Sequence, residues 1–451
     1  MNRAVVQGCA IATVDGESNE YRDGYIVVEG KYITEVGPGS YGGDIERRID
    51  MGGCLATPGL VNTHHHLVQW ATRGLAQQQP LFGWLTELYP LWAGIDAEIT
   101  RNAAAAGLGW LALSGCSTST DHHYVFPAGG GDLLAAGIEA AKSIGLRFHP
   151  CRGSMDLGAT VGGLPPDEIV EATDDALAAT AEAIDRWHDS APDSMLRIAV
   201  APCSPFSVTP RLMREAADLA RAKGVRLHTH LAETREEERF CRERYGRGPV
   251  DYAASLGWLG PDVWLAHGVH LDSRAVAELA ASGTALAHCP SSNARLGAGI
   301  APVGELLAAG VPVGIGVDGA ASQEAGQLGA ELRQALYSAR LAAGPAAMSV
   351  RQALALGTVG GARCLGRQDE IGSLEPGKLA DIAIWRLDDL GHAGIADPVA
   401  ALVLGPPAQV ELLLVNGAPV VSEGRLTGAS EIDLAAQLAV AAHRLMEGRR
   451  S

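Results

Sequence analysis

The sequence predicts an α/β fold, a (β/α)₈ (TIM) barrel with a small β-sandwich formed by both ends of the chain. Three observations favour it. Between residues 55 and 366, short apolar runs alternate with longer helical stretches, which is typical of βαβ units. Histidine and carboxylate residues fall at the C-terminal ends of those runs, where such barrels keep their active sites. Both ends of the 451-residue chain are rich in β-forming residues.

Residues 1–54 are expected to form the N-terminal part of the sandwich. Ala4–Gln7 and Tyr25–Glu29 are β-rich, and Asp15-Gly16 and Glu29-Gly30 are turn signals. No helical period precedes Cys54, so this piece is all-β and too short for a large core of its own.

Residues 55–366 are expected to form the barrel. One predicted helix, Thr209–Lys223, has Thr209 as its N-cap and Pro210 at its first position. Another is expected over Asp167–Asp189. The eight candidate strands are Leu60–His64, Cys116–Thr120, Leu146–His149, Leu196–Val200, Val225–His230, Val263–His267, Thr284–His288 and Val311–Asp318.

Two loops make this span longer than the roughly 250 residues typical of a bare barrel. They are Gln69–Gly94, rich in Gln, Trp and Leu, and Arg152–Pro166, rich in glycine. Both follow barrel strands, so we expect them to overhang the site as lids. The alternative is surface packing or a dimer contact.

Residues 367–451 are expected to complete the sandwich and to end in a helix. Ile371–Trp385 and Val410–Gly417 are β-rich, and Asn416-Gly417 is a strong hairpin signal. These strands should pair with the N-terminal ones, because both sets lack a partner sheet. A final helix is expected over Glu431–Met446.

The composition narrows the class of protein. The chain is 47% apolar, enough for a sizeable core, and its net charge of -17 argues against nucleic acid and anionic membranes as partners. No run of about 18 apolar residues and no apolar signal-peptide core is present. The eight cysteines are scattered without a CxxC pair, which favours reduced thiols in a cytoplasmic protein.

The first candidate metal ligands lie in Pro58–Leu67, which reads PGLVNTHHHL. Side chains two apart on a strand point the same way, so His64 and His66 should share one face and His65 should point away. Neutral imidazole is a common zinc ligand. An HxH pair alone could equally be a strand end with solvated histidines.

Two further groups convert that pair into a predicted metal site. His230 ends the fifth strand and Asp318 ends the eighth. Together with His64 and His66 they would satisfy one cation and leave a position for water. The plainer alternatives are hydrogen-bonded buried histidines, and an Asp318 that simply opens a turn before Gly319.

The predicted catalytic residues are Glu233, His267 and Asp318. A bound metal would lower the pKa of its water and make a hydroxide available for attack on the substrate. His267, at the end of the sixth strand, could hydrogen-bond this hydroxide. Glu233, just beyond the fifth strand, could shuttle a proton to a ring nitrogen. His123 is a further candidate for the pocket wall, and the roles of His122 and His288 stay open.

Five motifs of the chain match one family. They are PGLVNTHHH, HTHLAE, LAHGVHLD, HCPSSNARLGAGIAP and VPVGIGVDG. With these motifs the chain resembles the amidohydrolase superfamily, in the cytosine and guanine deaminase branch that also holds S-adenosylhomocysteine deaminases and s-triazine hydrolases. The resemblance covers essentially the whole length and implies one divalent metal, normally zinc or iron, with the ligands above. Two-metal members usually carry a lysine on strand four, and Leu196–Cys203 has none.

Within that branch, five further segments carry a closer likeness. They are TDHHY, RGSM, GLPP, APCSPFSV and DPVAAL. In these segments the chain most resembles 8-oxoguanine deaminases. S-adenosylhomocysteine deaminases usually place a histidine where this chain has Cys203, which weakens the hypothesis of a nucleoside substrate. Gln323-Glu324 departs from the 8-oxoguanine group, which usually has asparagine there, so the pocket beside Asp318 could be altered.

The expected function is therefore deamination of a small aromatic ring, 8-oxoguanine to urate and ammonia. Gln69, Trp70 and Arg73 of the first lid could pair with ring carbonyls and cover a planar face, with His123 and Cys203 completing the substrate site. An s-triazine or pterin hydrolase is the alternative. A non-catalytic scaffold is the third hypothesis, but such a protein should have lost a ligand or the proton shuttle. A homo-oligomer is expected.

Overall fold

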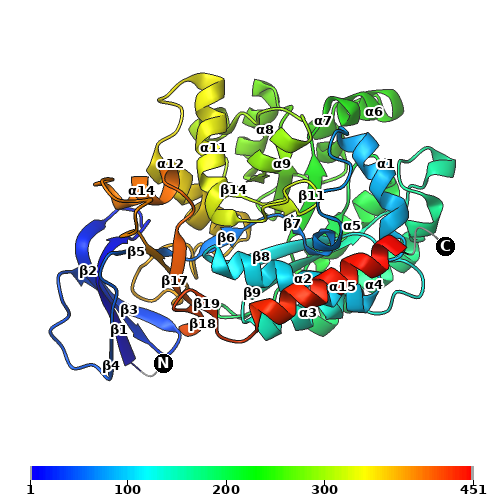
Figure 1. Ribbon diagram of the computed structural model, residues 1–451. Helices are drawn as coiled ribbons and strands as arrows, with labels where there is room; N and C mark the ends of the chain where they lie inside the picture. The colour runs from blue at the N-terminus through cyan, green and yellow to red at the C-terminus, as the bar shows by residue number, and fades with distance from the viewer. Residues whose placement is uncertain (1–2, 448–451) are drawn as a thin grey trace.

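The computed structural model describes residues 3–447, and its central feature is a closed parallel barrel (Figure 1). The strands follow one another in the order β10-β11-β12-β13-β14-β6-β8-β9. Each of the eight predicted runs contributes one strand, so the predicted barrel is confirmed. The strands are β6 (Leu60–Asn62), β8 (Cys116–His123), β9 (Arg147–Ser154), β10 (Ala199–Pro202), β11 (Leu227–Leu231), β12 (Val263–His267), β13 (Ala285–His288) and β14 (Val313–Ile315).

Several of the helices begin at a residue whose side chain accepts a backbone amide of the first turn. Thr209 caps the fifth helix as predicted, its hydroxyl accepting from the Leu212 amide, and Gly224 ends that helix in a left-handed conformation. The helices are α1 (Leu81–Trp92), α2 (Ala97–Leu113), α3 (Leu133–Ile144), α4 (Thr173–Trp187), α5 (Pro210–Lys223), α6 (Arg235–Tyr245), α7 (Pro249–Ser255), α8 (Ser273–Ser282), α9 (Pro290–Arg295), α10 (Val303–Ala308), α11 (Leu328–Ala343), α12 (Val350–Ala355), α13 (Gly361–Cys364), α14 (Pro398–Leu404) and α15 (Glu431–Glu447).

One predicted helix begins later than expected. The segment 167–189 contains a short 3₁₀ turn, Asp167–Ile169, and α4 starts only at Thr173. Between them the Glu171 carboxylate pairs with the Arg152 guanidinium at 2.6 Å. That ion pair fixes the segment in an extended conformation, which the helical period alone does not reveal.

The two ends of the chain form a second sheet, as expected. The described strands make one continuous nine-stranded sheet rather than two separate ones. It joins the ends where β5 pairs antiparallel with β16, and the predicted Asn416-Gly417 turn connects β17 to β18. The domain boundaries at residues 54 and 366 stay predictions. The strands are β1 (Arg3–Ala12), β2 (Glu20–Glu29), β3 (Tyr32–Pro38), β4 (Arg47–Asp50), β5 (Cys54–Pro58), β16 (Ile382–Arg386), β17 (Gln409–Val415), β18 (Ala418–Ser422) and β19 (Arg425–Leu426).

The two faces of this sheet belong to different cores. Leu55, Trp385 and Leu413 pack into the large cluster shared with the barrel. Their neighbours Ala56 and Ile384 belong to the sheet's own apolar cluster. Alternation along the strands therefore attaches one face of the sheet to the barrel.

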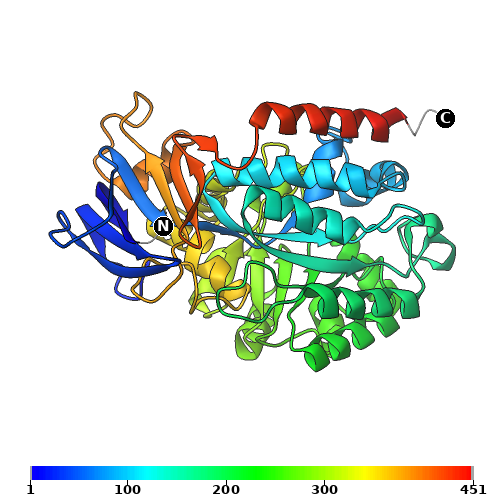
Figure 2. The same ribbon diagram turned by 90° about the horizontal axis from the view of Figure 1, so that it is seen from below.

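The last helix lies outside the barrel, alongside α2 (Figures 1 and 2). Arg444, near its end, pairs with Asp96 and Glu98 at the start of α2. All eight cysteines are buried and free. Within residues 3–447, no helix combines the length and the apolar character that crossing a membrane requires.

Candidate active site

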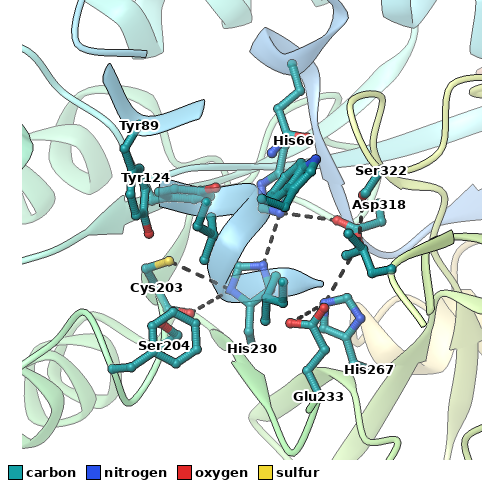
Figure 3. A pocket seen from close by; sticks show the side chains of 16 residues that line it. His66, Tyr89, Tyr124, Cys203, Ser204, His230, Glu233, His267, Asp318 and Ser322 are labelled. Atoms are coloured by element: carbon teal, nitrogen blue, oxygen red, sulfur yellow. Dashed lines mark hydrogen bonds and ion pairs between the residues drawn. The ribbon is translucent and has the colours of Figure 1, made fainter. Parts of the chain in front are cut away.

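Most of the predicted metal-binding and catalytic groups meet in a cavity at the C-terminal ends of the barrel strands (Figure 3). A short parallel ladder helps to assemble it, because β7 (His65–His66) pairs with β15 (Asp318–Gly319). The cavity is lined by His66, Gln69, Leu81, Trp84, Leu85, Tyr89, Tyr124, Cys203, Ser204, Phe206, His230, Glu233, His267, Leu296, Asp318 and Ser322.

Four of the predicted ligand atoms converge on one point. The Nε2 atoms of His66 and His230 are 3.0 Å apart. Oδ1 of Asp318 lies 3.3 Å from Nε2 of His66 and 3.4 Å from Nε2 of His64. Figure 3 shows the His66, His230 and Asp318 side chains directed toward one another from different strands.

Hydrogen bonds on the far side of each ring point its Nε2 at this centre. Nδ1 of His66 donates to the His122 carbonyl at 2.7 Å, and Nδ1 of His230 donates to the Cys203 carbonyl at 2.6 Å. A carbonyl only accepts, so each Nδ1 carries the proton and each Nε2 keeps its lone pair. Metal-ligating histidines are oriented in this way.

His64 is oriented through a second histidine. Nδ1 of His228 donates to the Trp264 carbonyl at 2.8 Å, so Nε2 of His228 must accept. It accepts from Nδ1 of His64 at 2.7 Å. Nε2 of His64 is then an unprotonated, fully buried nitrogen that has no hydrogen-bond partner in the described chain.

The protonation states suit a cation. Burial lowers the pKa of His66, and lowers the pKa values of His64 and His230 well below the usual range, so all three rings stay neutral. Burial alone would raise the pKa of Asp318, but the surrounding imidazoles of His64, His267 and His66 hold it well below its ordinary value. Three neutral imidazoles, one of which has an orphaned buried nitrogen, and one carboxylate fit a divalent metal.

Asp318 is held by its own contacts. Its Oδ2 accepts the Ser292 hydroxyl at 2.6 Å, and its Oδ1 accepts the Gly319 amide at 2.6 Å. Asp318 and His267 also have positive backbone φ angles, +63° and +74°. Such conformations are costly for residues other than glycine and gather at functional sites.

Glu233 and His267 face each other across the cavity. Nε2 of His267 lies 3.7 Å from Oε2 of Glu233 and 3.9 Å from Oδ2 of Asp318. The other nitrogen of His267 lies 3.0 Å from Oδ1 of Asn293. Burial, with the nearby charge of Asp318, raises the pKa of Glu233 well above its ordinary value. A raised pKa favours the protonated carboxyl, which is the form that can donate a proton.

The opposite wall comes mainly from α1, inside the first predicted lid. Leu81, Trp84, Leu85 and Tyr89 of this helix line the cavity. These residues, and Tyr124, were not predicted from the sequence to be part of the site. Their spacing of three and four along the chain is the signal that could have found the apolar face of a helix.

Two polar atoms of this wall are available to a ligand. The Oε1 atom of Gln69 and the hydroxyl of Tyr89 are buried and lack a hydrogen-bond partner among the described residues. Within residues 3–447, no lysine or arginine lines the cavity. The arrangement therefore suits a neutral molecule that offers hydrogen-bonding groups.

Of the five predicted substrate contacts, Gln69 and Cys203 line the cavity and three residues do not. Trp70 points away, its indole N–H donating to Nε2 of His65 at 3.3 Å. Arg73 stacks over the Trp70 ring at 4.3 Å. Gln69 and Trp70 are adjacent on a tight 3₁₀ turn, Leu67–Thr72, so their side chains leave it in different directions.

His123 is the third predicted substrate contact that does not line the cavity. Its Nε2 donates to the Val125 carbonyl at 2.9 Å and its ring packs on Phe126. Side chains alternate along a strand, and His122 already points inward toward His64. His123 therefore points out of the barrel.

The second predicted lid and the Gln323-Glu324 pair also lie outside the cavity, contrary to expectation. No residue of the second predicted lid, 152–166, lines the cavity. Gln323 and Glu324 also lie outside it. Gln323 donates to Glu331 at 2.6 Å, and Glu324 pairs with Arg295 at 3.0 Å. This departure from the family pattern thus anchors a turn and does not enter the pocket.

Known proteins resemble the chain over most of its length. A model described as amidohydrolase family matches residues 55–420. The chain is 45% identical over 419 residues to an 8-oxoguanine deaminase of Pseudomonas aeruginosa, covering 92% of each protein. It is 39% identical over 405 residues to an isoxanthopterin deaminase of an unknown prokaryotic organism, covering 85% of this chain and 84% of that protein.

A solved structure is similar as well. The atrazine chlorohydrolase of Arthrobacter aurescens TC1, complexed with zinc, matches with a TM-score of 0.93 and 35% identity. The match covers 97% of this chain and 100% of that one.

Proposed function

The chain belongs to the amidohydrolase family, and from this premise we propose that it is a metal-dependent aminohydrolase that converts 8-oxoguanine and water to urate and ammonia. The observation that supports this choice of substrate is the 45% identity to an 8-oxoguanine deaminase over 92% of both proteins. The reaction class also fits the groups that the barrel brings together.

We assign one divalent cation, zinc in preference to iron, to His64, His66, His230 and Asp318. The zinc in the similar atrazine chlorohydrolase structure supports this choice. When bound, such a cation would lower the pKa of a water toward neutrality and so supply a nucleophile.

Glu233 is the proposed proton shuttle. Its raised pKa favours the protonated carboxyl, which can protonate the ring nitrogen beside the amino-bearing carbon. The carbon then bonds to the water oxygen and loses its amine. One proton of the water ends on the ring nitrogen and the other on the departing ammonia.

His267 and Asp318 hold the attacking water. The bond between His267 Nδ1 and the Asn293 carbonyl oxygen keeps the ring fixed, with Nε2 directed at Glu233 and Asp318. We propose that this Nε2 accepts a hydrogen bond from the water, and that the ionised Asp318 receives its proton for transfer onward.

The cavity favours a small neutral ring. The absence of basic side chains from its described lining disfavours phosphorylated substrates. Trp84 and Tyr89 offer aromatic surface, while Gln69 and the Tyr89 hydroxyl offer hydrogen bonds to ring carbonyl and N–H groups.

A pterin is the second candidate. The similarity to isoxanthopterin deaminase, at 39% identity, favours it over an s-triazine. A pterin also carries an amino-bearing carbon beside a ring nitrogen, so Glu233 and the metal ligands would serve it in the same way.

Steady-state assays of ammonia release test the proposal. The substrates to compare are 8-oxoguanine, guanine, isoxanthopterin, cytosine and hydroxyatrazine, each with metal-loaded protein. We expect 8-oxoguanine to give the highest kcat/KM, above about 10⁴ M⁻¹s⁻¹. A higher kcat/KM for another ring would disprove the assignment of 8-oxoguanine as the substrate but would still support the proposed reaction class. No release from any amino-bearing ring would disprove the reaction class.

A further inference from the structure

A second buried carboxylate stands behind Glu233 and has no part in the mechanism above. Glu237 lies in the first turn of α6 and is fully buried. Its Oε1 accepts the Ala232 amide at 2.9 Å, and its Oε2 accepts the Glu233 amide at 2.8 Å. Both oxygens therefore hold the backbone that carries the proposed proton shuttle.

The turn that Glu237 holds is strained. Ala232 has a φ of +54°, a left-handed conformation that is unfavourable for a residue with a side chain. The Ala232 carbonyl accepts the His270 amide at 2.9 Å. Glu237 thus holds the amide side of the strained residue, and the β12–α8 connection holds its carbonyl side.

An ordinary helix cap does not explain these contacts. Thr234 caps α6, and Thr-x-x-Glu is the signature of a capping box, in which the glutamate accepts the amide of the cap residue itself. Gln352 of α12 makes that ordinary contact, accepting the Ser349 amide at 2.8 Å. Glu237 instead reaches past Thr234 to the two preceding amides.

We propose that Glu237 is a positioning residue, whose carboxylate holds the Ala232–Glu233 turn so that the Glu233 carboxyl faces His267 in the cavity. This inference rests on the proposed role of Glu233. Without the two hydrogen bonds, the turn can relax from its left-handed conformation and Glu233 leaves its place opposite His267, 3.7 Å away.

Glu237→Gln tests the proposal with little change in shape. The amide keeps one acceptor oxygen and places an NH₂ group against the other backbone N–H, so one of the two bonds is lost. We expect kcat to fall at least 30-fold, with KM changed less than threefold and metal content unchanged. Gln352→Ala is the matched control, since it removes the same helix position's contact far from the site, and we expect its kcat to stay within twofold.

A double-mutant cycle with Glu233→Gln separates positioning from a general structural effect. If Glu237 acts through Glu233, adding Glu237→Gln to Glu233→Gln should change kcat less than threefold. An equal loss in both backgrounds, or a wild-type kcat in the single Glu237→Gln variant, would overturn the proposal. A fully active Glu233→Gln would instead overturn the proposed role of Glu233, so the two failures are distinct.

Ala232→Gly supplies a rescue, including for a Glu237→Gln chain that folds poorly. Glycine adopts the left-handed conformation without strain, so Ala232→Gly in the Glu237→Gln background should recover at least fivefold in kcat. Recovery of folded protein without recovery of kcat would reduce Glu237 to a structural residue and reject the inference.

Discussion

At the scale of single residues, the site depends on which nitrogen of each histidine carries a proton. Carbonyls of His122 and Cys203 set this for His66 and His230, and a neighbouring ring, His228, sets it for His64. The consequence is three Nε2 lone pairs directed at one point beside Asp318.

Removing any one proposed ligand should release the metal. His64→Ala, His66→Ala, His230→Ala and Asp318→Ala each delete one donor of four, so we expect most metal to be lost from a wild-type content near one per chain, measured by elemental analysis. His288→Ala is the control, a buried histidine at the end of the adjacent strand β13 that does not line the cavity. A content near two, with activity depending on both ions, would refute the single-metal assignment.

Glu233→Gln should separate proton transfer from metal binding. The amide cannot donate an acidic proton to the ring, so kcat should fall by at least the roughly 10²–10⁴-fold typical of one acid–base group. Metal content should not change, since Glu233 is not a ligand. Glu238→Gln, on the outer face of α6 and paired with Arg235 and Arg242, is the control. Near wild-type turnover in Glu233→Gln would remove Glu233 from the mechanism.

At the scale of elements, the site is shaped by connections more than by the strands themselves. Helix α1 covers the cavity, and the turn after β15 is fastened from behind by Glu331 of α11. The Glu331 carboxyl accepts the Gln323 side chain at 2.6 Å and the Ser291 amide at 3.2 Å. Glu331 thereby ties α11 to α9 and to the turn beside Asp318.

This fastening should make stability depend on pH. Burial raises the pKa of Glu331 to about 7, from 4.5, despite its hydrogen bonds. Between these values the folded chain holds a proton that the unfolded chain has lost, so the group's contribution falls as pH rises through this window. We expect the Tm of wild type minus that of Glu331→Gln, both metal-free, to decrease from pH 5.5 to pH 8. A difference independent of pH would contradict the assignment.

At the scale of the whole molecule, the outer sheet is bound to the N-terminal end of the barrel by a buried ion pair. Arg147, which begins β9, is fully buried and pairs with Asp381 at 3.0 Å. It also donates to the Ser194 carbonyl at 2.6 Å and to the Asn416 side chain at 2.7 Å. The network joins the barrel to strands from the C-terminal end of the chain. The oligomeric state and the cellular compartment stay predictions.

Breaking this pair should destabilise the fold without changing the chemistry. Asp381→Ala leaves the Arg147 charge buried and unpaired, which costs about 3–5 kcal/mol. We expect urea unfolding to show this loss, with KM for the substrate unchanged because the cavity is at the other end of the strands. Glu139→Ala, which breaks the exposed pair with Arg101, should cost only about 0–1 kcal/mol. Equal costs for the two variants would refute the network's importance.

Local patterns in the sequence determined the set of strands and the residues at their ends. Strand and helix periods are properties of neighbouring residues, so the eight barrel strands, the sheet from both ends and the hairpin at Asn416-Gly417 could all be predicted. The positions of His64, His66, His230, Glu233, His267 and Asp318 followed from one general rule, that parallel strands present their C-terminal ends to a common site.

Only the tertiary structure decided which other side chains meet there. The orientation of Trp70, Arg73 and His123 away from the cavity depends on one turn and one strand register. The inclusion of Trp84 and Tyr89 depends on how α1 packs, and the contact of Glu237 with the Glu233 backbone depends on a strained turn. These contacts join groups through space, and their geometry is set by packing of the whole barrel. The local pattern that places a residue on a strand or helix does not contain this geometry.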